Sequence, residues 1–221
     1  MFDSTTISMI GQGTLDTLYM TIVSTVMGYV LGIPLGIALT VTDSTGLRPN
    51  SVIYKILDLI TNILRSVPFL ILLVLVSPLT KLIVGKSYGS SATIVPLVIS
   101  AAPFIGRMVE SSLKEVDNGV IEAAKSMGAS TVTIIRRVLL VEARTSLLIG
   151  MTIAFGTILG YSAMAGTLGG GGLGDIAIRY GYYRYEADIM VVTTFLLVIL
   201  VMVMQNLGMK LSKVIDKRLI N

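Results

Sequence analysis

The sequence predicts an all-α membrane protein with five transmembrane helices and a polar loop on the cytoplasmic side. Three observations predict this fold class: an apolar composition, long segments without charge, and an uneven distribution of Lys and Arg between the connecting segments. Apolar residues make up 53% of the 221 residues and charged residues only 14%, whereas soluble domains average about 25% charged residues. A soluble protein of this composition has too little polar surface to cover its exterior, so the surplus is expected to face lipid.

Four segments without a charged side chain are long enough to cross a bilayer. A helix needs about 20 residues to span the hydrocarbon core of roughly 30 Å, and the four segments cover residues 17–42, 87–106, 145–174 and 189–209. A fifth segment qualifies if Asp58 lies at its edge and Arg65 is tolerated inside it. We expect one domain, 1–221, with transmembrane helices at about 17–42, 57–80, 90–111, 145–166 and 189–209.

The distribution of Lys and Arg predicts the orientation, because cytoplasmic loops collect cations. The segments 43–56, 112–144 and the tail after 209 hold eleven Lys and Arg residues, and the alternate segments hold four. We therefore expect the N-terminus outside and the C-terminus in the cytoplasm. These cations are then membrane-flanking anchors and headgroup partners rather than a nucleic-acid surface.

Several function classes are excluded by residues that the chain lacks. The chain contains no Cys and no His, so disulfides, thiolate or imidazole metal sites and His- or Cys-based catalysis are excluded. No G-x-x-x-x-G-K-[ST] motif is present, so the chain has no P-loop with which to bind ATP.

The central loop 112–144 is predicted to form two short helices. Asp117 or Asn118 can cap the first helix, because their side chains accept hydrogen bonds from free N–H groups. Gly128 suits the turn that follows, since glycine readily adopts positive φ. Ser130 or Thr131 can cap the second helix, in which apolar residues recur at helical spacing.

The first of these helices has features of a docking element. Ala123, Ala124 and Gly128 permit close approach of a partner surface, and Glu122 and Lys125 can add polar contacts. A solvated linker hairpin fits the spacing equally well. The similar Ala-x-x-x-Gly spacing of DNA-binding helix-turn-helix motifs is rejected, because the adjacent membrane helices leave no room for a duplex.

The stretch "EAAKSMGA", followed by Val138-x-Leu140, resembles the signature of permease subunits of bacterial ABC importers. The resemblance implies that the loop is the coupling helix, which inserts into a cleft on the cytoplasmic ATPase and transmits its movements to the membrane helices. The matching positions are Glu122, Ala123, Ala124, Gly128, Val138 and Leu140. The sequence departs from the family at Val141 and Thr145, where prolines are common.

The resemblance extends over nearly the whole chain. "LRSVPFLILLVLVSPLT", "AAPFIGRMVE" and "GYSAMAGTLGGGGLGDIAIRYGY" are similar to the permease subunits of methionine importers. This implies a type I ABC importer permease fold in the bacterial cytoplasmic membrane. It also implies a homodimer that works with two cytoplasmic ABC ATPase subunits and an external methionine-binding lipoprotein. ATP and Mg²⁺ are then expected in the ATPase, and no cofactor in this chain.

Five residues are candidates for the translocation pathway or its gate: Arg65, Pro68, Tyr161, Ser162 and Met164. An arginine inside a span usually has partners or reaches water, and a proline frees a carbonyl one turn back. These features place Arg65 in the translocation pathway or at a moving helix break, and snorkelling to the cytoplasmic headgroups is the alternative. A narrow apolar constriction excludes water and ions, so Met164 is the candidate constriction. Core packing is the alternative for this methionine.

Three further patterns have structural interpretations. The stripe Ser24, Gly28, Gly32 and Gly36 predicts close helix packing in lipid. Arg107 and Glu110 are spaced to form an ion pair. The segment 169–174, "GGGGLG", fits a dinucleotide fingerprint only by chance because it follows a membrane helix rather than a strand, and we expect a flexible external loop.

The sequence therefore predicts the permease subunit of an ATP-driven amino-acid importer, with methionine as the expected substrate, and not an enzyme. Two alternatives remain: an importer permease for another small polar solute, and an ion-coupled transporter or channel that does not use ATP. The second is disfavoured because the first, fourth and fifth predicted spans carry no ionisable residue near their middles.

Overall fold

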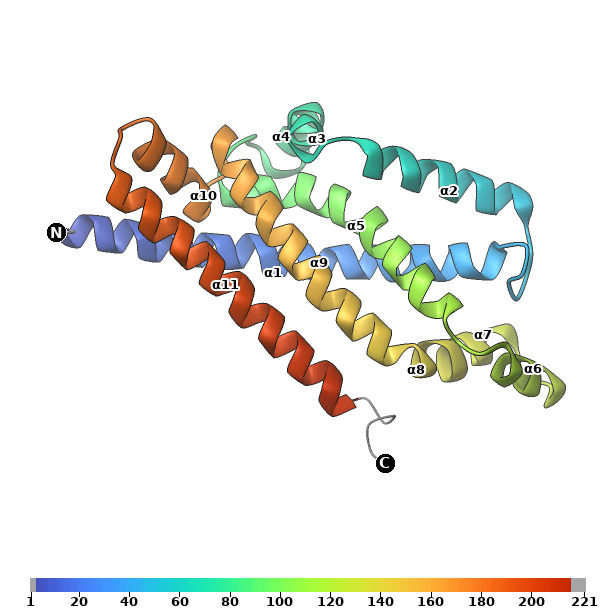
Figure 1. The fold of residues 1–221 in the computed structure, drawn as a ribbon. Helices are drawn as coiled ribbons and strands as arrows, with labels where there is room; N and C mark the ends of the chain where they lie inside the picture. The colour runs from blue at the N-terminus through green and yellow to red at the C-terminus, as the bar shows by residue number, and fades with distance from the viewer. Residues whose placement is uncertain (1–2, 216–221) are drawn as a thin grey trace.

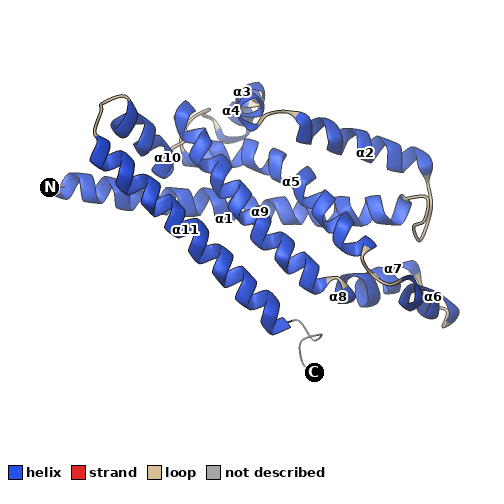
Figure 2. Cartoon of the chain, viewed as in Figure 1, coloured by secondary structure: helices blue, strands red, loops and turns tan. Residues whose placement is uncertain are grey.

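The structure is a computed structural model that describes residues 3–215. Four long helices form most of the molecule. Within this range the chain forms helices joined by loops and turns, without a strand (Figure 2). The long helices are α1 (Ser4–Thr42), α5 (Ser90–Lys114), α9 (Arg144–Ala165) and α11 (Ala187–Ile215) (Figure 1). All four include segments that are apolar and long enough to cross a membrane.

The first helix is longer than the range 17–42 that was expected for it. α1 spans 39 residues, which corresponds to about 58 Å. It begins at Ser4, where the carboxylate of Asp3 accepts a hydrogen bond from the Ser4 N–H at 2.7 Å. The prediction stopped at Asp16 because a charge is costly in lipid, but a helix that continues beyond the hydrocarbon core can hold an acidic residue there.

The small residues of α1 allow it to pack closely against α5, as the sequence predicted. Gly28, Gly32 and Gly36 are buried, and a Cβ atom added to Gly32 would lie 2.6 Å from the Ile105 side chain. At Gly36 an added Cβ would lie 2.6 Å from the Gly106 carbonyl oxygen. These separations are too short for any larger residue, so the stripe sets the distance between the two helices.

The segment expected as one helix over 57–80 is instead three helices: α2 (Ser51–Ser66), α3 (Phe69–Leu75) and α4 (Ser77–Val84). The chain bends by 103° between α2 and α3. Pro68 lacks an N–H and disfavours helical geometry at the residue before it, and Val67 accordingly has extended backbone angles, φ −77° and ψ 124°. The prediction of one continuous helix was wrong, because the chain at Pro68 ends one helix and begins another in a different direction.

The glycine-rich segment is packed against the bundle, so the expectation of a flexible loop was wrong. After α9 the chain forms η2 (Gly166–Leu168), α10 (Gly172–Ile176) and η3 (Ala177–Tyr182). The Leu173 N–H donates to the Thr17 hydroxyl at 2.8 Å, and the Thr93 hydroxyl donates to the Gly170 carbonyl at 3.1 Å. These contacts fix the segment to α1 and α5. In Figure 1, α10 lies near the N-terminal part of α1.

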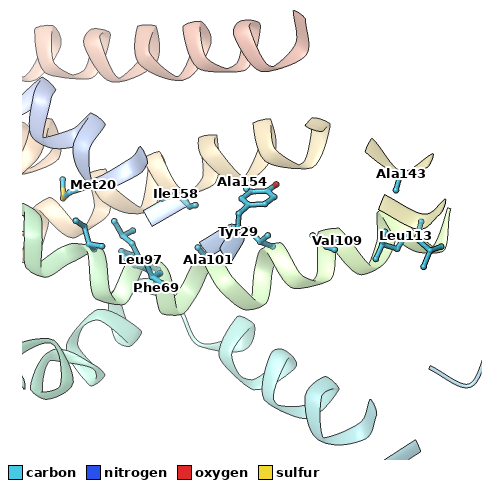
Figure 3. Close-up of a cluster of buried hydrophobic side chains, with 14 of the residues drawn as sticks. Met20, Tyr29, Phe69, Leu97, Ala101, Val109, Leu113, Ala143, Ala154 and Ile158 are labelled. Carbon is cyan, nitrogen blue, oxygen red and sulfur yellow. The ribbon is translucent and has the colours of Figure 1, made fainter. Parts of the chain in front are cut away.

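A single apolar core runs along α1, α5 and α9. Figure 3 shows Tyr29 of α1 between α5 and α9, close to Ala101 and Ala154. The cluster continues to Leu113 at the end of α5 and to Ala143 before α9. The bundle therefore holds the entry to and the exit from the central loop in fixed positions.

Candidate functional site

The central loop lies at the end of the bundle that is distant from Ser4 and α10 (Figure 1). It contains α6 (Asn118–Ser126), α7 (Thr131–Ile134), η1 (Ile135–Leu139) and α8 (Leu140–Glu142). The first residues of the predicted range 112–144 belong to α5, which ends at Lys114. Ala143 alone separates α8 from α9, so the loop leads directly into a membrane helix.

Local sequence signals account for both helix starts and for the turn between them. The Asp117 carboxylate accepts from the Gly119 N–H at 2.7 Å, and the Ser130 hydroxyl accepts from the Thr133 N–H at 3.2 Å. Gly128 has φ +77°, and a Cβ atom there would meet nothing within 4 Å. Backbone conformation, rather than space, therefore favours glycine at this position.

The exposed surface of α6 differs from the small-residue face inferred from the sequence. Ala124 is only 5% exposed and packs in the core cluster with Ile134 and Leu139. Its neighbour Ala123 is exposed. Val120, Ala123 and Met127 follow helical spacing on the outer side of α6, and we call this exposed set the α6 ridge. Met127 is the most prominent member, with 81% of its surface exposed.

The other predicted coupling residues lie around this ridge or behind it. Glu122, Lys125 and Gly128 are exposed. Val138 and Leu140 are half-buried and pack against the core on either side of the fully buried Leu139. From the sequence Met127 is predicted to lie on a small, mildly apolar docking face with Ile121 and Ala124, whereas Val120 is not predicted as a contact residue. The signal available for Val120 was its spacing from Ala123 on one side of the helix.

Two of the pathway candidates lie at the break between α2 and α3. Arg65 is exposed in the last turn of α2, and Pro68 is the N-cap of α3. Arg65 lies fourteen positions after Ser51, the first residue of α2, which corresponds to about 21 Å along the helix. This distance is several times the length of an arginine side chain, so Arg65 cannot reach the loop between α1 and α2 by snorkelling.

Tyr161 is held by an aromatic contact that the sequence analysis missed. Its ring stacks on the ring of Phe69, with centroids 4.7 Å apart and an interplanar angle of 3°. Phe69 is the first residue of α3 and is 6% exposed. The contact joins the start of α3 to α9, so the aromatic residue that follows Pro68 belongs with the pathway candidates.

Ser162 and Met164 have different environments. Ser162 is buried, and its hydroxyl donates to the Leu159 carbonyl of the same helix at 2.8 Å. Its polar group is therefore directed to the helix backbone. Met164 is 48% exposed and lies one turn beyond Tyr161, near the end of α9 that is farthest from the central loop.

A chain of charged side chains joins the C-terminal end of α1, the helix α2 and the part of α5 that precedes the central loop. Arg107 forms ion pairs with Asp58 of α2 and with Glu110, and the second pair was predicted from the sequence. Lys114 lies 2.9 Å from Glu110 and 2.5 Å from Asp43, which follows α1. We call these five residues the polar clasp. The hydrogen bond from Lys114 holds the pKa of the Asp43 carboxyl below its ordinary value.

Within residues 3–215 no three acidic side chains converge as a metal site would require. The described residues that stand out are the exposed α6 ridge and the helix break beside Phe69 and Tyr161. The bundle of long apolar helices and the broken helix define the class of protein: a multi-pass membrane protein with an exposed helical loop at one end.

Comparison with known proteins identifies the family. Residues 32–221 match the family described as binding-protein-dependent transport system inner membrane component. The chain belongs to this family. It is therefore the membrane component of a transport system, located in the cell membrane, and not an enzyme.

Individual relatives cover nearly the whole chain. It is 51% identical over 205 residues to the probable D-methionine transport system permease protein MetI of Vibrio cholerae, covering 93% of this chain and 91% of that protein. It is 45% identical over 217 residues to the methionine import system permease protein MetP of Bacillus subtilis, covering 98% of both.

Solved structures show the same architecture. A chain of the inward-facing MetNI methionine ABC transporter superposes with a TM-score of 0.96 at 44% identity, covering 98% of this chain and all of that one. A chain of an amino acid ABC transporter solved with histidines has a TM-score of 0.73 at 21% identity, covering 96% of this chain and 95% of that one. The fold is that of type I ABC importer permeases, as the sequence resemblance implied.

Proposed function

We propose that this chain is the permease subunit of an ATP-driven methionine importer. The proposed assembly is a homodimer with two cytoplasmic ATPase subunits and an external substrate-binding lipoprotein. The agreement with a chain of a methionine ABC transporter, at a TM-score of 0.96, is the observation that supports this most. The two permeases named above support the same substrate. The substrate therefore follows from the relatives rather than from a side chain that contacts methionine.

In this proposal the α6 ridge inserts into a cleft on the ATPase. Val120, Ala123 and Met127 supply the apolar contact, and Glu122 and Lys125 supply polar contacts beside it. Val138 and Leu140 hold the following helices against the core. ATP and Mg²⁺ bind in the partner subunits. Closure of the ATPase pair then moves the two central loops together and changes the membrane helices from inward-open to outward-open.

The proposed orientation places the α6 ridge in the cytoplasm and the N-terminus outside. It rests on the excess of Lys and Arg in the segments at the α6 end of the bundle. α10 and the end of α9 then lie on the outer side, where the binding protein would deliver its substrate.

The proposed gate lies near the outer end of α9. Tyr161 and Met164 are one turn apart, and Phe69 holds Tyr161 through the ring stack. Apolar side chains at a constriction exclude water and ions. Pro68 supplies the helix break at which α3 can change direction relative to α2, and Arg65 places a positive charge beside that break. Ser162 is left out of the proposed gate because its hydroxyl bonds to its own helix.

The test is transport by the assembled complex. The permease, its partner ATPase and the external binding protein are reconstituted in liposomes with ATP on the ATPase side, and uptake of radiolabelled methionine is measured. We expect uptake with ATP and none with ADP. Equal uptake with ADP, or ATP-driven uptake of histidine without methionine, would contradict the proposal.

A further inference from the structure

The polar clasp connects three segments that lie far apart in the sequence. The Arg107 guanidinium donates to the Asp58 carboxylate and, at 3.0 Å, to the Asn62 side-chain oxygen, both on α2. On its other side it donates to Glu110 at 2.7 Å. The Glu110 side chain is only 6% exposed, and the cations of Arg107 and Lys114 flank it. Removing one member of this chain would leave the charge of its buried partner unpaired, which is costly.

Apart from these contacts, α2 is linked to α5 through Tyr54, whose ring lies under the Lys114 ammonium at 5.8 Å from the ring centroid. Of its sixteen residues only Thr61 is buried. Its large apolar side chains mostly point away from the bundle and are exposed: Val52, Ile53, Ile56, Leu59, Ile60 and Ile63. Apolar packing therefore contributes little to the position of α2 within one protomer. The contacts of Asp58 and Asn62 with Arg107 are its main polar link to α5.

The polar clasp also lies between the docking helix α6 and the proposed gate beside Phe69. Lys114 ends α5, three residues before Asp117, which caps the docking helix α6. Asp58 lies nine residues before Val67, where the chain bends into α3 and leads to Phe69. A movement of the central loop can therefore reach the gate by a continuous physical route through α5, the clasp and α2.

We propose that the Asp58–Arg107 pair is the linkage by which α5 moves α2 when the ATPase subunits close. Asp58 and Arg107 are then positioning residues: they contact neither ATP nor substrate. The inference rests on the proposed function and adds to it the residues that transmit the movement. Without the pair, α5 and the central loop still respond to ATP, but α2 and the start of α3 no longer follow.

The test uses the reconstituted complex and measures methionine taken up per ATP hydrolysed. Asp58→Asn removes the charge and keeps the size of the side chain. We expect uptake per ATP to fall at least about fivefold, with ATP hydrolysis retained. Asp58→Glu keeps the charge and is expected to stay close to the unaltered protein. The matched control is Asp16→Asn, the same change on an acid that bonds to Gln12 instead, and its ratio should not change.

If methionine uptake per ATP hydrolysed is unchanged in Asp58→Asn, whether both rates are retained or both fall equally, the inference is overturned. If Asp58→Asn does not assemble with the ATPase, Asn62→Leu removes a neutral contact to Arg107 without leaving a charge unpaired. We expect about a twofold fall in its ratio, and no fall would overturn the inference. The unaltered complex in the same liposomes reports separately on the proposed function, because only the failure of that function removes its ATP-dependent methionine uptake.

Discussion

At the scale of single residues, Gly172 is constrained both by backbone conformation and by space. Its φ is +76°, a region that residues with a side chain rarely adopt, and an added Cβ would lie 2.6 Å from the Thr17 hydroxyl oxygen. That hydroxyl accepts the hydrogen bond from Leu173. A side chain at Gly172 would therefore disturb the contact that fixes the glycine-rich segment to α1.

Gly172→Ala is accordingly expected to destabilise the protein by about 1–3 kcal/mol, because backbone strain and a steric clash act together. Thermal unfolding in detergent measures this. The control is Gly160→Ala on α9, where an added Cβ meets nothing within 4 Å and alanine favours the helix. Equal stability of the two variants would contradict the assignment.

Met164 allows a residue-scale test of the proposed gate. Met164→Ala shortens an exposed side chain near the outer end of α9, and we expect ion leak or ATP hydrolysis without transport, because a wider opening admits water. Ion flux into liposomes and uptake per ATP measure the two effects. Met151→Ala is the control, since Met151 is similarly exposed (43%) on the same helix but far from the gate. Unchanged flux and coupling in Met164→Ala would count against the constriction.

At the scale of elements, one face of α6 packs against the rest of the protein and the opposite side is exposed. Ala124 packs against η1, whereas the α6 ridge has no partner among residues 3–215. In the proposed assembly such a helix can pass a movement of the ATPase on to the membrane helices, because its inner face is held by the core while its exposed side contacts the ATPase.

Met127→Asp places a charge on the most exposed member of the α6 ridge and is expected to cost at least about 2 kcal/mol of binding to the ATPase, since an unpaired charge would be desolvated. Co-purification of the two subunits checks it. Ser126→Asp adds the same charge on the preceding residue, which is exposed but is not part of the ridge, and should affect binding less. If both variants bind the ATPase equally, the ridge is not the contact surface.

Features of the structure that depend on neighbouring residues were predictable from the sequence, and features that depend on contacts between distant residues were not. Asp117, Gly128 and Ser130 act on their immediate neighbours, so their roles in the loop were predictable. The contact between Asp58 and Arg107 joins positions 49 residues apart, and no local pattern indicates it. The 103° bend at Val67 and Pro68 was missed because hydropathy reports the length of an apolar segment but not its direction.

At the scale of the whole molecule, the absence of cysteine provides a direct test of orientation. The chain has no Cys, so a single introduced thiol is the only one in this subunit. Tyr185 is 90% exposed and lies near the start of α11, at the opposite end of the bundle from Met127. The two positions should therefore face opposite compartments.

We expect Tyr185→Cys to react with a membrane-impermeant maleimide on intact cells, and Met127→Cys to react only after the membrane is permeabilised. The physical reason is the excess of cations at the α6 end, which favours the cytoplasm. Gel-shift labelling measures both variants, and Cys substitution of neither residue removes a hydrogen bond or an ion pair described here. The reverse pattern of labelling would invert the proposed orientation.

The length of α1 has a consequence for how the molecule sits in its bilayer. A rod of about 58 Å tilted by 40°, the upper end of the range for membrane helices, still rises about 44 Å, which equals the full thickness of a bilayer with its headgroups. At any smaller tilt the helix is longer than the bilayer is thick, so at least one of its ends extends beyond the lipid headgroups. A protein that approaches the membrane on that side would contact this end of α1 before it reached the lipid.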